Sequence, residues 1–212
     1  MATVGMVYAP PGMGKTSSLR NFTNDQVAVF SVSGKRFPFK SDLKMAVSDS
    51  YEAIARTLPK IEQKTIVIDD ATYLMVHEFM RNAKVNGYQK YTDIGKNFYD
   101  LIQAAKALPD DKTVWFLGHM ETMEDGREHF KTIGKMLDNY VSLEGEFEIV
   151  LKAVVRDGKY YFSTHNTGSD TVRTPFGMFE DDYIDNDLAM VDKVIREYWD
   201  MPENPPKKES KK

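Results

Sequence analysis

The chain has 212 residues, of which 42% are hydrophobic and 28% are charged. This length and composition predict a globular protein with one sizeable domain, with or without a small appendage. No apolar run approaches the roughly 18 residues that a membrane-spanning helix needs, so we expect no membrane association. The N-terminus does not resemble a secretory signal. The absence of cysteine excludes disulfides and thiolate metal sites and is typical of a reducing compartment.

The formal net charge is −4. The last six residues hold four lysines and one glutamate, which leaves 24 basic and 31 acidic residues, a charge of −7, on the rest of the chain. Such acidity excludes a broad face that wraps duplex DNA, but it leaves room for a narrow basic groove or loop. We expect one domain over residues 1–200 and a disordered, lysine-rich tail over residues 201–212.

The first motif is a glycine-rich turn between an expected strand and an expected helix. Residues 4–8 are a short apolar run typical of a buried strand, and residues 9–14 lead into residues 15–19, where we expect a helix to begin. Glycines let several backbone N–H groups converge on one anion at a helix N-terminus. Lys15 would then contact the β- and γ-phosphates, and the Thr16 hydroxyl would bind Mg²⁺. The pattern predicts a nucleoside triphosphate site on Pro11, Gly12, Met13, Gly14, Lys15, Thr16 and Ser17.

One position departs from the pattern G-x-x-x-x-G-K-[ST], because Ala9 replaces the first glycine. Alanine is acceptable there if its φ stays negative, and Pro10 and Pro11 stiffen the turn. The alternative is a chance turn rich in glycine and proline before a helix. That alternative requires the Gly-Lys-Thr sequence, the strand and the helix to coincide.

The next elements along the chain are a strand and a short helix. The alternation in Q-V-A-V-F-S-V-S predicts a second strand over residues 26–33. Residues 34–41 form a basic, aromatic turn segment. We expect a helix over residues 51–58, because Pro59 ends it.

Residues 65–70, T-I-V-I-D-D, are an apolar strand closed by two carboxylates, which resembles a Walker B segment. The strand fixes the acids at the carboxyl edge of the sheet, where ligands of open α/β sheets bind. We place Asp69 on the Mg²⁺ shell. The alternative is an acid that caps the following helix.

Helices are then expected over residues 71–83 and 93–108, and they flank an irregular loop over residues 82–91. A buried strand over residues 113–118 ends at His119, and a polar loop over residues 120–131 follows it.

The last third is expected to contain a hairpin, a loop and two helices. The runs 147–155 and 159–164 flank Asp157-Gly158, a turn pair typical of a two-residue hairpin. We expect helices over residues 132–140 and 188–199, the second capped by Asp185 or Asn186, and a loop over residues 166–182.

The order of these motifs resembles that of RecA-like ATPases of bacteriophages, including the Sak-type single-strand annealing proteins. The resemblance runs to about Trp199 and rests on A-P-P-G-M-G-K-T, I-V-I-D-D, the strand ending Gly-His, K-T-I-G-K-M-L at 131–137 and D-T-V-R-T-P-F-G-M-F around Arg173. It implies an α/β, RecA-like P-loop NTPase fold, with a mainly parallel sheet flanked by helices and an antiparallel hairpin at its edge. The strand ending in His119 would lie between the phosphate-loop and Walker B strands.

The resemblance also implies catalytic roles. His119 would face the γ-phosphate and report hydrolysis, although a histidine that merely caps a buried strand is the alternative. Arg173 is a better candidate than Arg127 or Arg156 for a basic residue that completes the site of a neighbouring subunit. RecA-like enzymes usually place a catalytic glutamate after the second strand, and residues 31–35 offer none. The remaining candidate for positioning the attacking water is Asp70, and Glu121 is a weaker option. Because aspartate is shorter than glutamate, we expect slow hydrolysis.

Two loops of RecA-like proteins touch DNA, and they correspond here to residues 82–91 and 120–131. Tyrosine rings stack on bases and lysines follow phosphates, which suits single-stranded DNA. The candidates in the two loops are Lys84, Tyr88, Lys90, Tyr91 and Arg127. The alternative is a solvated connection between helices.

The resemblance therefore implies an oligomeric ATPase in the cytoplasm of an infected bacterial host. It would use ATP and Mg²⁺, act on single-stranded DNA in recombination or annealing, and have a phage single-strand-binding protein as a further partner. Two alternatives stay open: an ATP switch that binds a protein partner without motor activity, and a nucleotide or small-molecule kinase.

Overall fold

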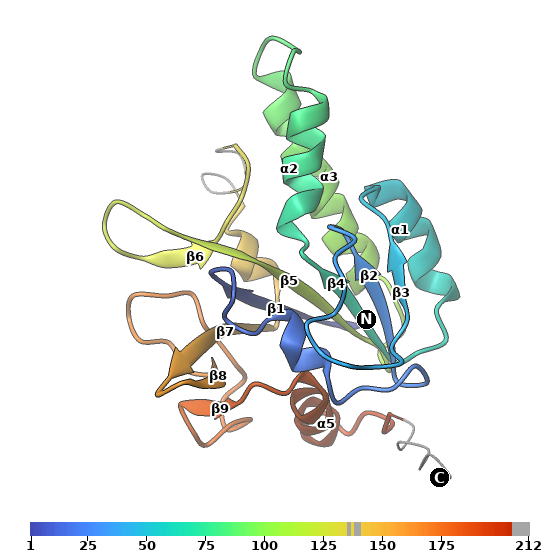
Figure 1. Ribbon diagram of the computed structural model, residues 1–212, viewed down its shortest axis with the longest axis vertical. Helices are drawn as coiled ribbons and strands as arrows, with labels where there is room; N and C mark the ends of the chain where they lie inside the picture. Colours follow the sequence, from blue (N-terminus) through green and yellow to red (C-terminus); the bar gives the residue numbers. More distant parts are fainter. Residues whose placement is uncertain (135–136, 138–140, 205–212) are drawn as a thin grey trace.

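The computed structural model describes residues 1–134, 137 and 141–204 (Figure 1). Its strands form one sheet in the order β3-β2-β4-β5-β1-β7-β8-β9, and β6 pairs with β5 outside this order. The pairs from β3 to β7 are parallel, whereas β7–β8, β8–β9 and β5–β6 are antiparallel. The strands are β1 (Thr3–Ala9), β2 (Val27–Ser31), β3 (Met45–Val47), β4 (Thr65–Asp69), β5 (Thr113–Thr122), β6 (Glu128–Phe130), β7 (Ile149–Arg156), β8 (Lys159–Ser163) and β9 (Tyr183–Asp185).

Helices cover both faces of this sheet. The α-helices are α1 (Tyr51–Thr57), α2 (Thr72–Arg81), α3 (Gln89–Lys106) and α5 (Leu188–Tyr198), and the 3₁₀ helices are η1 (Thr16–Leu19), η2 (Leu58–Lys60) and η3 (Leu143–Glu146). Figure 1 shows α1, α2 and α3 on one side of the sheet and α5 on the other. The predicted fold, a mainly parallel sheet between helices with an antiparallel hairpin, is confirmed. In the described part of the chain, no helix is long and apolar enough to span a bilayer.

The central strand β1 supplies both hydrophobic cores. Side chains alternate along a strand, so Met6 and Tyr8 join the core under α1–α3, while Val7 and Ala9 join the core under α5. Burial on both faces explains why its sequence is continuously apolar instead of alternating. β1 lies between β5 and β7, with Ala9 opposite His119. The end of β1 is thereby placed beside the end of β5.

The turn Asp157-Gly158 joins β7 to β8 as predicted. Both residues have positive φ, +50° and +73°, as a type I′ turn requires at its two central positions. β9 adds a third antiparallel strand to this edge, which the sequence pattern did not predict.

Several boundaries differ from the prediction. The helix after the phosphate loop is only the single 3₁₀ turn η1, and the short strand β3 was not predicted. The helix α5 is capped by Asp187, whose carboxylate accepts from the N–H groups of Ala189 and Met190, so the predicted caps Asp185 and Asn186 are wrong. Most of the predicted helix 132–140 lies outside the described residues.

Both predicted DNA loops are shorter than expected. The helix α3 begins at Gln89, so residues 89–91 are helical. The strand β5 continues to Thr122 and pairs with β6, so residues 120–130 form mostly a hairpin. The polar character of these segments suggested loops, but cross-strand pairing and packing against α2 decided their structure.

Residues 201–204 of the predicted tail contact the domain. The Asn204 side chain donates to Asp192 and Thr65, at 2.6 and 2.8 Å. Residues 201–204 are therefore attached to the domain, and the rest of the predicted tail lies outside the described residues.

Candidate functional site

The phosphate-loop residues wrap around the carboxyl end of β1. Gly12 and Gly14 have φ of +81° and +87°, a region that glycine adopts without strain. The Lys15 ammonium folds back into the loop and donates to the carbonyls of Ala9 and Pro10, at 2.9 and 3.0 Å. These carbonyls hold the cation where phosphate oxygens would meet it. Burial lowers the pKa of Lys15 to about 8, although Asp70 and Asp69 oppose the shift.

A hydroxyl and a carboxylate meet beside this lysine. Thr16 Oγ1 donates to both carboxylate oxygens of Asp69, each at 3.0 Å. Asp69 ends β4 and is buried. Burial raises its pKa to about 6, and the neighbouring Asp70 carboxylate adds to the shift. A buried carboxylate without a full counter-charge, next to a hydroxyl, suits Mg²⁺, which prefers oxygen ligands and retains waters and substrate phosphates. Thr16 and Asp69 therefore fit this metal ion.

Asp70 directly follows β4 in a backbone conformation that is rare for a residue with a side chain. Its φ is +59°, and such outliers persist only where surrounding structure fixes them. Its Oδ2 accepts from Ser33 Oγ at 2.6 Å and lies 3.5 Å from Lys35 Nζ. Its Oδ1 lies 3.8 Å from Nε2 of His119. The ends of β2 and β4 thus converge on one carboxylate with His119, the last residue of β5 that pairs with β1.

The imidazole ring of His119 faces this carboxylate and contains a nitrogen that forms no hydrogen bond with the described residues. Nε2 is buried and has no hydrogen-bond partner in the described part of the chain. The backbone N–H donates to Thr72 Oγ1 at 2.9 Å, and the ring packs edge-on against Tyr73 at 5.4 Å between centroids. Burial lowers the pKa of His119, and Lys15 lowers it further. The lowered pKa favours the neutral imidazole, although Asp70 opposes the shift, and Nε2 lies at the carboxyl edge of the sheet.

Ser33 and Lys35 were missed by the sequence reasoning, which noted only that residues 31–35 lack a glutamate. Lys35 Nζ lies 5.0 Å from the centroid of the Tyr73 ring and close enough to Lys15 and His119 to lower their pKa values. The signal that could have identified this segment was its position at the end of β2, because β2 pairs with β4 and brings Ser31 opposite Asp69.

Arg173 does not lie near this site within the chain. It forms a bridge with Val150, and its guanidinium donates to the carbonyl of Phe147, before β7 begins. β1 and β7 are parallel, so this group lies toward the amino edge of the sheet, away from the phosphate loop at the carboxyl edge. Arg173 therefore does not contribute to the phosphate site of its own subunit, and its predicted role at the site of a neighbouring subunit stays a prediction.

Two further candidates, Arg127 for DNA binding and Glu121 for positioning water, lie on the β5–β6 hairpin. Arg127 is exposed and pairs with Asp125 at 2.7 Å in the turn. Glu121, the weaker candidate for positioning water, lies in β5 two residues beyond His119, where it contacts His129 at 3.5 Å.

The first predicted DNA loop is the tip of a helical hairpin that projects beyond the sheet (Figure 1). Tyr88 is 89% exposed, and Lys84 is also exposed. Tyr91 instead lies on α3 and packs against Phe79, with ring centroids 5.8 Å apart. The Lys90 ammonium lies over both of these rings. Tyr91 and Lys90 therefore stabilise the tip, whereas Tyr88 and Lys84 are exposed on it.

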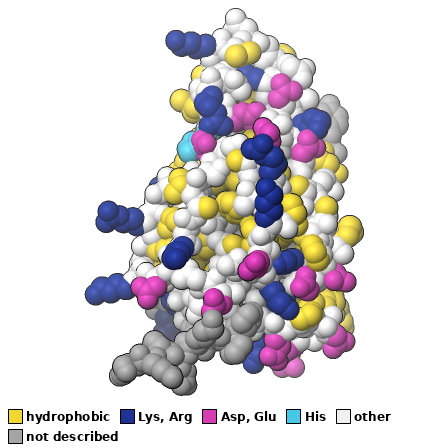
Figure 2. Space-filling view, turned by 90° about the vertical axis from the view of Figure 1, so that its right-hand side faces the viewer, with side chains coloured by type: hydrophobic (Ala, Val, Ile, Leu, Met, Phe, Trp, Pro, Cys, Tyr) yellow, Lys and Arg dark blue, Asp and Glu magenta, His cyan; other side chains and the backbone are white. Residues whose placement is uncertain are grey.

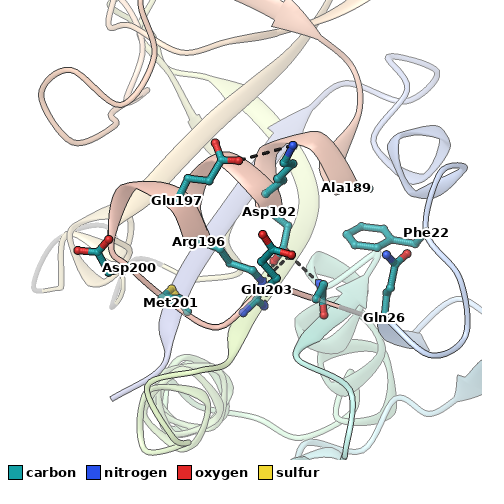
Figure 3. Close-up of a pocket in the computed structure, with 11 residues that line it drawn as sticks. Phe22, Gln26, Ala189, Asp192, Arg196, Glu197, Asp200, Met201 and Glu203 are labelled. Carbon is teal, nitrogen blue, oxygen red and sulfur yellow. Dashed lines mark hydrogen bonds and ion pairs between the residues drawn. The ribbon is translucent and has the colours of Figure 1, made fainter. Parts of the chain in front are cut away.

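A separate cavity of about 510 Å³ lies at the opposite end of the sheet (Figure 3). Its wall includes the buried ion pair Asp192–Arg196 on α5, 2.7 Å long. Asp192 also accepts from the hydroxyls of Thr65 and Thr113 at 2.8 and 2.6 Å. These hydroxyls belong to the first residues of β4 and β5, so the cavity is at the amino edge and is not part of the phosphate site.

Comparison with known proteins identifies the family. A family model described as an AAA domain matches residues 1–172, and no curated protein matches the chain. The match includes the phosphate loop, the paired aspartates after β4 and the end of β5. Because it covers most of the chain, the protein belongs to the AAA domain family and is an AAA-type P-loop NTPase.

Proposed function

We propose that this protein is an ATPase of bacteriophage origin, related to the Sak-type annealing proteins, which acts on single-stranded DNA in recombination or annealing. The observation that carries the ATPase activity is the convergence of three strand ends. They bring Lys15, Asp69, Asp70 and His119 to one edge of the sheet.

We assign each residue a role that its position supports. The loop N–H groups and Lys15 bind the phosphates, and Thr16 with Asp69 holds Mg²⁺, which neutralises phosphate charge when it is bound. Asp70, fixed by the Ser33 hydroxyl at 2.6 Å, orients the attacking water. His119 offers its free Nε2 to the γ-phosphate region.

The DNA-binding part of the proposal uses the helical tip. Tyr88 presents a ring for base stacking and Lys84 presents a charge for the backbone. Figure 2 shows basic and acidic side chains interspersed on one face, without a continuous basic band. A local stacking contact suits such a surface better than a broad electrostatic one. A phage single-strand-binding protein is a further proposed partner, and a second copy of the chain would supply the missing basic finger, for which Arg173 is the candidate.

The test is ATP turnover with and without single-stranded DNA, with Lys15→Ala as the inactive control. We expect slow turnover that DNA stimulates. ATP binding without turnover would instead support a switch that only sets partner affinity. One observation favours that second function: Asp70 is already engaged by Ser33 and Lys35. ADP release only in the presence of an acceptor would identify a kinase.

A further inference from the structure

A tyrosine and an asparagine form a wall on one side of the phosphate loop. A Cβ atom placed on Gly14 would lie 2.8 Å from Cδ1 of Tyr160 and 3.2 Å from Oδ1 of Asn186. Tyr160 belongs to β8, and Asn186 lies between β9 and α5. Two segments from the last quarter of the chain are thus in contact with the residue that precedes Lys15.

Asn186 is buried, and its side-chain amide forms no hydrogen bond with the described residues. The residue is 1% exposed, and neither Oδ1 nor Nδ2 has a hydrogen-bond partner in the described ranges. Buried polar groups are nearly always paired, so an amide with both ends free indicates a missing partner. The backbone around it is fixed, because its N–H donates to the carbonyl of Tyr160 at 3.3 Å and its carbonyl accepts from Arg20.

The chemistry of this pair suits a nucleobase. An amide offers a donor next to an acceptor, which matches the N6 amino group of adenine and the ring nitrogen beside it. Tyr160 is 49% exposed, so its ring is accessible to a base that binds beside Gly14. Aromatic rings stack on bases through their faces.

The position relative to the phosphates is also suitable. Gly14 lies next to Lys15 and Thr16 in sequence, and Asp69 and Asp70 are on the side of the loop that faces β4. The wall of Tyr160 and Asn186 comes from β8 and the start of α5, beyond β7 on the other side of β1. The metal and hydrolysis groups are therefore separated from this wall by the loop itself, which is the separation that exists between the terminal phosphate and the base of a nucleotide.

We propose that Asn186 and Tyr160 form the base-binding part of the nucleotide site, and that the Asn186 amide selects adenine. This inference rests on the proposed nucleotide site. It makes the specificity of the enzyme depend on residues outside its sequence motifs.

The test compares ligands that share phosphates but differ in the base. Calorimetry would measure the affinity of the full-length protein for Mg²⁺-ATP, Mg²⁺-GTP and inorganic tripolyphosphate. Asn186→Leu keeps the branched side chain with the same number of heavy atoms but removes both polar atoms. Tyr160→Ala removes the ring, while Tyr160→Phe retains it. We expect Asn186→Leu to weaken ATP binding about tenfold or more, to reduce the preference for ATP over GTP, and to leave tripolyphosphate affinity unchanged. Tyr160→Ala should also weaken ATP selectively, and Tyr160→Phe should not.

Three outcomes would overturn the inference. An equal loss of ATP and tripolyphosphate affinity would show that the two side chains only support the loop. Unchanged ATP affinity in both Asn186→Leu and Tyr160→Ala would show that no base contacts them. Binding of neither ATP nor tripolyphosphate by the unmodified protein would instead reject the nucleotide site itself. A thermal melt separates folding from binding, and since Leu replaces an unpaired amide, Asn186→Leu should not lower the melting temperature.

Discussion

At the residue scale, the phosphate site is built from charges that the fold disfavours. Burial lowers the pKa of Lys15 to about 8 and raises that of Asp69 to about 6, so both groups are shifted toward their neutral forms. A phosphate beside the lysine and a divalent cation beside the carboxylate would restore the charged forms. The charged forms of Lys15 and Asp69 are therefore stabilised more by bound ligands than by the neighbouring side chains.

This arrangement predicts the behaviour of Lys15→Ala. The substitution removes the main cation of the loop, so we expect ATP affinity to fall far more than threefold. The melting temperature should change little, because the two hydrogen bonds lost are offset by the removal of a poorly solvated ammonium. Calorimetry and a thermal melt would check both, with the exposed Lys44→Ala as a control of equal charge change. ATP affinity within about threefold of the unmodified protein (under ~0.7 kcal/mol) would contradict the phosphate-loop assignment.

Substitutions of the two aspartates should affect different steps, nucleotide binding for Asp69 and hydrolysis for Asp70. Asp69→Asn is expected to weaken Mg²⁺-dependent nucleotide binding, because it removes the charged metal ligand. Asp70→Asn should spare binding and slow turnover, and Ser33→Ala should act in the same direction more weakly, since the hydroxyl only holds the carboxylate. Steady-state kinetics and binding titrations measure the difference. Equal losses of binding in Asp69→Asn and Asp70→Asn would make Asp70 a second residue of the metal shell.

The sequence identified the residues of this edge that belong to motifs. Lys15, Thr16 and the two aspartates follow from spacing, because a strand must deliver them to the sheet edge. Ser33, Lys35 and Asn186 do not, because each comes from a segment without a motif, and only the strand order brings them to the site. Arg173 was assigned from resemblance alone, as a residue for a neighbouring subunit's site, and within its own chain it contacts the carbonyl of Phe147.

At the element scale, the strand β5 does more than fill the sheet. Its last residues leave the parallel sheet and pair with β6. Gly118 is the point where this change occurs. A Cβ there would lie 2.1 Å from the Phe130 ring and 2.6 Å from Thr72 Oγ1, and the latter accepts the backbone N–H of His119. The glycine allows β6 to fold back over the strand that carries the histidine.

Gly118→Ala should therefore destabilise the protein. Overpacking of a filled core costs typically about 1–3 kcal/mol, and here the ring has little room to move because Phe130 is fully buried. Urea denaturation would measure the loss. Gly145→Ala is the matched control, since its new Cβ would meet only ordinary contacts at 3.4 Å or more. Equal stability of the two variants would show that the hairpin adjusts freely.

The helical tip predicts a division between its two tyrosines. Tyr88→Ala should weaken single-stranded DNA binding at about 0.15 M salt by roughly 1–3 kcal/mol, the usual contribution of a stacked base, with an unchanged melting temperature. Tyr91→Ala should lower the melting temperature, because its ring packs against Phe79. Fluorescence anisotropy with ATP present, together with a melt, would resolve the two. Unchanged DNA affinity in a stable Tyr88→Ala variant would reject the tip as the binding element.

At the scale of the whole molecule, the fold was predictable because its long elements are strongly patterned. The central strands are continuously apolar and the long helices keep a 3.6-residue period, so their existence and type followed from the sequence. The short elements did not. β3, β9 and the β5–β6 hairpin are held by pairing with neighbours that are distant in the chain, which no local pattern reports.

The amino edge of the sheet contains a buried polar cluster that connects α5 to the first residues of β4 and β5. Arg196 and Asp192 are each 2% exposed, and together they bind Thr65, Thr113 and the carbonyl of Asp111. Asp192→Ala would leave a buried guanidinium without its partner. We expect a loss of about 3–5 kcal/mol in the free energy of unfolding, measured by urea denaturation, with nucleotide affinity unchanged in the folded protein. A loss under about 1 kcal/mol would show that water replaces the carboxylate.

The position of β1 has a consequence for synthesis. This strand precedes both of its neighbours in the chain, which begin at Thr113 and Ile149. At about 5–20 residues per second, a growing chain waits roughly 7–30 s between completing β1 and reaching β7. During that time the apolar strand lacks at least one of its two partners, and exposed apolar strands of this kind are prone to aggregation unless chaperones protect them. The phosphate loop after β1 therefore lacks its complete support until β5 and β7 have been translated, and a nascent chain cannot bind a nucleotide there before that point.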